Sequence, residues 1–494
     1  MKQNSPLASK RACKAFSVAC LISLLASSCP YTNPLYQPLL LVSMGIGALL
    51  LVWQFIVDRS IYRHPYFLIL FLFCVSYGVT ILLNRQSGFF TNCGQLVYTA
   101  FYFFLCFCGF SRFSAEDRAD VLRLLCRIAL LFSLIIAVVS LGMMLANYSA
   151  EVPFRGSTIL IGFHSRNNSM QLTGITGGPS TLSLLCLAGL VSAWYLLYLP
   201  RRKLTPCCAA AAVIYLLTLC AANVYAALIM MLAFAVLFAF CRSFCGCVPS
   251  ALGKRIVKAA VQAALLCGLI VCCFYGVQKL ESAAVNSISN AVYQHELQDA
   301  DAQQPSNPST DIPGTDIPST DIPGTDIPAP PQAIHIDRKL ATSANGVRLS
   351  LWKEGIKLFL SHPLGVTNNN ISVKIFYGVP DYEYTNLHNG YLTLLVSAGI
   401  IGFAIVIVFG AVLFIRAMKY LTACRDPETC QKLSVLIALC GAILAGDLVN
   451  GCFVLWRGLQ YIFLWLLLGS ICAVISVPPD PTKEKTMIED AYGQ

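Results

Sequence analysis

Residues 128–146 read Ile-Ala-Leu-Leu-Phe-Ser-Leu-Ile-Ile-Ala-Val-Val-Ser-Leu-Gly-Met-Met-Leu-Ala, a run of apolar and small residues without a charge. A helix of about 20 such residues crosses the roughly 30 Å of hydrocarbon in a bilayer. Similar runs recur along the 494-residue chain, which is 57% hydrophobic and only 12% charged. A soluble domain carries about twice that share of charged residues. The sequence therefore predicts an all-α, polytopic membrane protein.

The apolar runs divide the chain into about 12 predicted transmembrane helices. These are 14–29, 36–57, 66–83, 95–110, 122–146, 179–199, 206–222, 223–241, 257–278, 390–416, 432–450 and 457–477. The region 206–241 is either two short helices or one long, broken helix, and in the second case the spans number eleven. The predicted parts are an N-terminal transmembrane bundle of about nine spans (1–278), a large outer-face loop (279–389), the C-terminal spans (390–477) and a cytoplasmic tail (478–494).

The distribution of lysine and arginine predicts that both termini face the cytoplasm. With the N-terminus inside, 23 of the 34 basic residues fall in inner segments. Seven of the other 11 lie in the one long outer loop, where the charge bias has little weight. Inner connections that face anionic lipid account for the net charge of +10 without a nucleic-acid partner. The first span is alternatively a signal peptide, because it has a basic start and a short apolar stretch.

The long outer loop contains two stretches of opposite character. Residues 309–328 repeat the pair Ser-Thr-Asp-Ile-Pro and Gly-Thr-Asp-Ile-Pro twice. A proline at every fifth position forbids a helix, so we expect a mobile acidic spacer without chemistry. Residues 346–361 instead predict an amphipathic helix that ends at His362-Pro363. Arg348 heads the apolar face of this helix, where it must find a partner or extend to water.

Four motifs stand in order within residues 346–402. They are Arg348-Leu-Ser-Leu-Trp352, His362-Pro-Leu-Gly365, Tyr384-Thr-Asn-Leu-His388-Asn-Gly-Tyr391 and Gly399-Ile-Ile-Gly402. Their order and spacing resemble the signature of the O-antigen ligase and polymerase superfamily, and the glycine-rich stretch 174–180 resembles a further segment of that family. The sequence departs from the family at Ala222-Asn223-Val224, where members often carry a Ser-Arg pair.

The resemblance implies transfer of a saccharide from undecaprenyl diphosphate to an acceptor hydroxyl, on the outer face of the cytoplasmic membrane of a bacterium. It implies neither a nucleotide sugar nor an obligatory metal. The outer-face carboxylates near the signature, Asp381, Glu383 and Asp447, form no metal-ligand pattern such as Asp-x-Asp, so we expect no cofactor. Polymerases and ligases share the signature; the lack of any sign of a lipid A partner slightly favours a polymerase.

This chemistry requires cations for the leaving diphosphate and a base for the acceptor hydroxyl. Arginine suits the first role, because its planar fork binds phosphate oxygens in pairs. The candidate substrate-binding residues are Arg348, Arg457, Arg155, Arg166 and, from the arginine–tryptophan helix of the resemblance, Trp352. His388, where the long loop enters a span, is the candidate base, and the nearby Glu383 is the alternative.

Each of these residues also has a purely structural interpretation. His388 would then be a helix cap or an interfacial residue, and Arg348 a snorkelling anchor. Arg457 would form an ion pair with Asp447, while the arginines of the 147–178 segment would be solvated. For the whole chain, the alternatives are a transporter or flippase of lipid-linked saccharide and a non-catalytic membrane protein. The span centres are almost free of charge, which disfavours a transport pathway.

Overall fold

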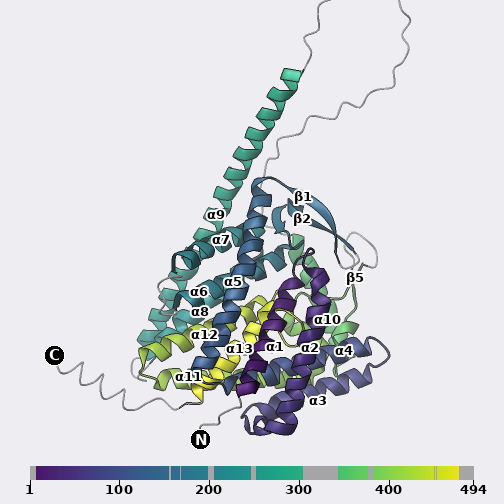
Figure 1. Ribbon diagram of the computed structural model, residues 1–494, viewed down its shortest axis with the longest axis vertical. Helices are drawn as coiled ribbons and strands as arrows, with labels where there is room; N and C mark the ends of the chain where they lie inside the picture. Colours follow the sequence, from purple (N-terminus) through teal and green to yellow (C-terminus); the bar gives the residue numbers. More distant parts are fainter. Residues whose placement is uncertain are drawn as a thin grey trace, which may run out of the picture.

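The computed structural model describes residues 7–154, 157–166, 169–198, 205–245, 252–303, 343–375, 382–449, 451 and 453–477. The pentapeptide repeat, Arg155 and the C-terminal tail lie outside these residues. The described part is a bundle of closely packed helices, with two small sheets beside it (Figure 1).

The twelve predicted spans all fall on apolar helices. These are α1 (Leu7–Ala26), α2 (Tyr36–Trp53), α3 (Phe67–Leu83), α4 (Phe89–Ala100, continued by the π-helical η4, Phe101–Gly109), α5 (Ala115–Leu145), α6 (Pro179–Tyr198), α7 (Thr205–Ala222), α8 (Tyr225–Phe244), α9 (Leu252–Gln303), α11 (Gly390–Ala423), α12 (Pro427–Gly446) and α13 (Leu459–Ile475). In the described residues, seven helical segments have the length and composition to cross a membrane, and three shorter apolar helices accompany them. The protein is thus a multi-pass membrane protein, and the count of twelve spans stays a prediction.

The region 206–241 forms two helices. α7 ends at Ala222 and α8 begins at Tyr225, and Asn223 between them has a φ of +52°. The side-chain amide of Gln278, from α9, donates to the Asn223 side-chain oxygen (2.9 Å) and to the Cys220 carbonyl (3.0 Å). A neighbouring helix therefore provides a hydrogen bond to the Cys220 carbonyl at this break, as an apolar environment requires.

Two features of the connecting segments differ from the sequence prediction. The segment 147–178 holds a three-stranded antiparallel sheet of β1 (Ser149–Phe154), β2 (Ser157–Arg166) and β3 (Ser169–Gly174). The loop predicted to begin at 279 begins instead as helix, since α9 continues to Gln303 and projects beyond the bundle (Figure 1). The all-α description therefore fits the bundle but omits these strands and those in the following loop.

The amphipathic helix predicted at 346–361 is α10 (Ser343–Ser361). Its Leu351 is fully buried in a small apolar cluster with Leu387 and Val396, separate from the core of the bundle. On the opposite face Lys357 pairs with Glu354 at 2.6 Å. A two-stranded antiparallel sheet, β4 (Val373–Ile375) and β5 (Tyr382–Tyr384), follows the helix. α10 thus packs on α11 and on β4.

The backbone of the turn after α10, residues 363–367, forms hydrogen bonds with α11 at a break in that helix. We call this junction the splice. At Gly399 the helix has φ +68°, and the Ile400 N–H donates to the carbonyl of Pro363 (3.0 Å). The Val396 carbonyl, which Ile400 would bond in an uninterrupted helix, accepts instead from the Val366 N–H (2.9 Å). The backbone of the His-Pro-Leu-Gly motif thereby completes the hydrogen bonds of a transmembrane helix.

Aromatic packing at the centre of the bundle holds these helices in place. The ring of Trp465 in α13 lies 4.8 Å from Phe103 in η4 and stacks at 5.8 Å on Phe409 in α11. All of η4 is buried. η4, α11 and α13 are therefore anchored in one continuous core.

Candidate active site

His388 lies in a tight turn that several independent contacts fix. Its backbone has a φ of +49°, and its N–H donates to the side-chain oxygen of Asn386 (2.9 Å). The indole N–H of Trp352 donates to the carbonyl of Leu387 (3.0 Å). The side chain of Asn389 caps α11 by accepting from the Tyr391 and Leu392 N–H groups at 3.1 and 3.0 Å. The imidazole is thus carried on a rigid turn at the start of a transmembrane helix.

Arg348 lies beside this histidine. Burial and the positive charge of Arg348 both lower the pKa of His388 below its ordinary value, burial having the larger effect. Arg348 stands one helical turn before Trp352 on α10, on the face that contacts the His388 turn. Both side chains are half-buried. The fold therefore brings together a cation and an imidazole of lowered pKa from positions 40 residues apart in the chain.

Glu383 occupies a different environment. It is exposed on β5, opposite Lys374 of β4, and accepts a hydrogen bond from the hydroxyl of Ser372. The groups that shift the pKa of His388 do not include this carboxylate. Its position is open to water on a surface hairpin, whereas His388 is held between α10 and α11.

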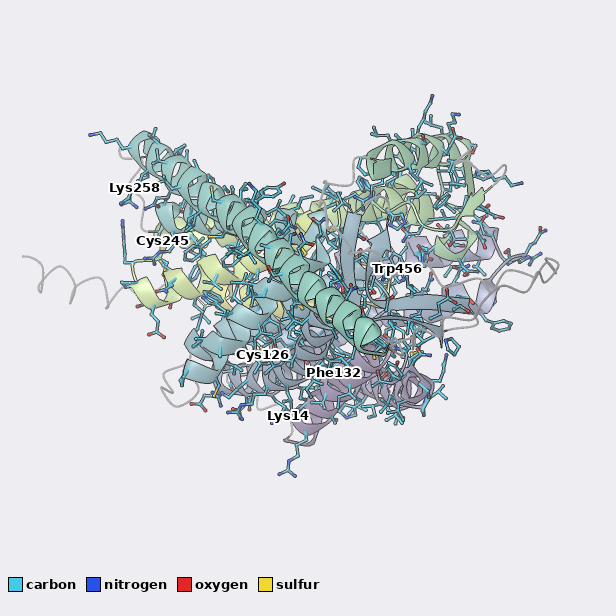
Figure 2. The ribbon with its side chains drawn as sticks, turned by 90° about the horizontal axis from the view of Figure 1, so that it is seen from above. Lys14, Cys126, Phe132, Cys245, Lys258 and Trp456 are labelled. Atoms are coloured by element: carbon cyan, nitrogen blue, oxygen red, sulfur yellow. The ribbon has the colours of Figure 1, made fainter. Side chains whose placement is uncertain are left out.

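Arg457 does not form the ion pair with Asp447 that the sequence suggested as an alternative. Its guanidinium lies 4.5 Å from the ring centre of Tyr98 in α4, in the geometry of a cation–π contact. The Asp447 carboxylate instead accepts from the hydroxyl of Tyr461 (2.9 Å). Arg457 lines a cavity of about 460 Å³ that also has hydroxyl and amide groups on its walls. Trp456, the preceding residue, lies on the side of the molecule where α10 is found, away from Cys245 and Lys258 (Figure 2).

The two remaining arginine candidates are only partly placed. Arg166 ends β2, where its backbone pairs with Ser169. Arg155 lies outside the described residues. The site that can be built from the described side chains contains Arg348, Trp352 and His388.

The sequence analysis did not predict two backbone contacts of the site, both of which involve Gly390. The N–H of Gly390 donates to the backbone carbonyl of Asp447 (2.6 Å), and a Cβ at Gly390 would collide with the carbonyl of Gly451. The α12–α13 connection therefore packs against the turn that carries His388 and forms a backbone hydrogen bond with it. No local sequence pattern predicts such a contact. The Asn-Gly pair before an apolar run does predict the helix cap at Asn389.

A comparison with protein families agrees with this arrangement. Residues 169–407 match the family model described as O-antigen ligase. The match covers just under half of the chain and makes this region similar to the O-antigen ligase superfamily. The matched O-antigen ligase region contains Arg348, Trp352, Glu383 and His388, whereas Arg155, Arg166 and Arg457 lie outside it. No curated protein matches the chain.

The likeness to the O-antigen ligase superfamily implies glycosyl transfer of the ligase or polymerase type. It also implies partners among lipid-linked saccharides and polysaccharides. In the described residues, no group of three or more His, Cys, Asp or Glu side chains has the geometry to hold a metal ion.

Proposed function

We propose that this protein transfers or polymerises saccharide units from an undecaprenyl-diphosphate-linked donor to an acceptor hydroxyl, on the outer face of a bacterial plasma membrane. The observation that carries the proposal is the position of Arg348 beside His388, which lies on a hydrogen-bonded turn at the start of α11 and has a lowered pKa. Burial and the charge of Arg348 both favour the uncharged form of His388, which is the form that can accept a proton.

The reaction needs one bond to form and one to break. The acceptor oxygen attacks the anomeric carbon of the donor sugar, and the bond from that carbon to the diphosphate oxygen breaks. The electron pair of the broken bond stays on the diphosphate. The acceptor proton passes to His388, which its lowered pKa keeps neutral and able to accept it.

Arg348 stabilises the charge that grows on the leaving diphosphate. Its guanidinium can donate two parallel hydrogen bonds to phosphate oxygens, and it stays charged at any physiological pH. Trp352 holds the turn that carries His388 through its bond to Leu387, and it stands one helical turn from Arg348. Trp352 therefore contributes to substrate binding by holding Arg348 and His388 at fixed positions relative to each other.

The test is a transfer assay with purified components. Wild-type protein in nanodiscs should move saccharide from a purified lipid diphosphate donor to an acceptor, and release the lipid diphosphate in equal amount. A transporter would instead move the intact donor across a sealed vesicle without releasing lipid diphosphate. Movement of intact donor with no new glycosidic bond would contradict the proposal and support the flippase alternative.

Within this activity, we favour polymerisation over ligation to a lipid A acceptor. Supplying only the lipid-linked repeat unit should then yield a ladder of lengthened lipid-linked chains. If product appears only when a separate lipid A-type acceptor is added, the protein is a ligase.

A further inference from the structure

A second cation site exists at the same end of the bundle, apart from Arg348 and His388. The side chain of Arg457 is half-buried, and the face of its guanidinium rests on the ring of Tyr98. Among the described residues, no carboxylate forms an ion pair with it. Stacking against the ring fixes the plane of the guanidinium and leaves its N–H edge available for an anion. We call the 460 Å³ space beside it the Arg457 cavity.

An apolar cavity of about 320 Å³ adjoins the Arg457 cavity. Leu184 of α6 and Gln460 of α13 line both spaces, so the two share a wall. The other walls of the second space, which we call the apolar cavity, come from α7, α8, α9 and α12. Apart from Gln460 and the indole of Trp194, its described lining side chains are hydrocarbon or thioether.

We propose that the two cavities form one binding site for a polyprenyl phosphate lipid, with the phosphate at Arg457 and the first part of the chain in the apolar cavity. The chemistry of the walls favours this occupant. A free sugar or a soluble anion would leave the apolar cavity unfilled, whereas a neutral lipid would leave the guanidinium unpaired. An anionic head joined to a long hydrocarbon chain satisfies both.

The inference rests on the proposed function for its role in the reaction. A transfer between two lipid-linked saccharides needs two phosphate positions, and Arg348 supplies one of them. The Arg457 cavity supplies the other. The two positions are close, since Gly451 lines the Arg457 cavity and its carbonyl packs directly against Gly390, two residues from His388.

The experiment measures binding without turnover. Full-length protein in nanodiscs is incubated with a polyprenyl diphosphate that carries a diazirine on its chain and no saccharide, and mass spectrometry locates the adducts after illumination. We expect adducts on α6 and α13. Arg457→Gln should weaken binding about ten-fold or more, the usual worth of a charge-assisted hydrogen bond pair. Arg85→Gln, which removes an exposed arginine from the α3–α4 connection, should not.

A second variant tests the apolar cavity. Ala188→Trp fills part of it and should lower the yield of chain adducts, while Gly410→Trp places the same side chain in a separate apolar cavity and should leave the yield unchanged. Ala188→Leu serves as a milder filling variant if the tryptophan prevents folding, judged by a single symmetric gel-filtration peak. Wild-type yield in a folded filling variant would overturn the proposal.

Competition defines the occupant. Unlabelled polyprenyl diphosphate should displace the probe, whereas a polyprenyl alcohol and phosphatidylglycerol should not at the same concentration. Displacement by phosphatidylglycerol would make the cavities a general lipid site and overturn the assignment. Adducts confined to α10 and α11 would do the same. A wild-type protein that binds the probe at Arg457 yet transfers no saccharide would keep this site and refute the proposed function.

Discussion

Arg348 carries its charge in a form that lysine cannot reproduce. The planar guanidinium can hold two phosphate oxygens at once, whereas an ammonium group acts as a point charge. Arg348→Lys should therefore lose much of the transfer activity although the charge is kept. The initial rate of transfer from purified lipid diphosphate donor measures this, with Lys353→Arg on the charged face of α10 as the matched control. Wild-type turnover in Arg348→Lys would reduce Arg348 to a snorkelling anchor.

Parallel substitutions of His388 and Glu383 test which of the two residues is the base. His388→Gln keeps the size of the side chain but not its basicity, so turnover should fall roughly 10²–10⁴-fold, the usual worth of general base catalysis. Donor binding should survive, because the proposed phosphate ligands are Arg348 and Arg457. Glu383→Gln should stay near wild type, since this carboxylate is exposed and bonded to Ser372. If instead His388→Gln stays active and Glu383→Gln is inactive, the base is the carboxylate.

The lowered pKa of His388 sets the acid limit of the activity. A base works while it is unprotonated, so the rate should hold as pH falls through 6.5, the ordinary value, and decline only below it. Removing the charge of Arg348 raises the pKa of His388, because the neighbouring cation is one cause of the lowering. The pH profile of residual kcat/KM in Arg348→Gln should therefore decline at higher pH than that of wild type. An unchanged acid limb would show that the two groups are not coupled.

At the scale of the element, the splice between the 363–367 turn and α11 depends on two glycines. Gly365 has φ +92°, and a Cβ there would lie 2.6 Å from the Gly399 nitrogen and the Ser397 carbonyl oxygen. Gly365→Ala should therefore destabilise the fold by about 1–3 kcal/mol from backbone strain alone, before any steric cost. Gly410→Ala, in the same helix with no atom near its Cβ position, should be neutral or slightly stabilising. Thermal unfolding in detergent distinguishes the two, and equal transition temperatures would contradict the prediction.

The elements that the sequence predicted are those with a strong local pattern. α10 was predicted within three residues at its start and to the residue at its end, because its apolar spacing and the following His362-Pro363 are local signals. The strands β1–β3 were not predicted. The pairing of β2 with β3 also shifts register at Gly162–Phe163, which breaks the strict alternation of a strand. The splice at Gly399 was also not predicted, since it joins groups 30 or more residues apart.

At the scale of the molecule, the predicted orientation can be tested directly. Both termini and the basic cluster 201–203 should be cytoplasmic and residues 300–335 outside, because inner connections gather lysine and arginine. A reporter that works only in the cytoplasm should be active when fused after Lys203 and silent when fused after Gln303, where α9 ends. Activity after Gln303 would reverse the assignment of the long loop.

The motif order identified Arg348, Trp352 and His388, but only the folded chain shows why they belong together. α10 reaches the start of α11 through the cluster around Leu351 and Leu387, which no single segment encodes. The Arg457 environment was beyond sequence reasoning for the same reason. Tyr98 stands 359 positions earlier in the chain, and the alternative ion pair with Asp447 rested on closeness in sequence alone.

The splice at Gly399 also bears on how the chain is built. The turn at 363–367 precedes α11 in the sequence, so with the predicted orientation it leaves the ribosome first and reaches the far side of the membrane before α11 is inserted. The unpaired backbone groups of α11 can then bond to this turn as soon as the helix is inserted. The new helix therefore does not remain in lipid with unpaired polar groups. A permuted gene that placed α10 and its turn after α11 would encode the same contacts. In that protein, however, α11 would be inserted before the turn that pairs its backbone groups.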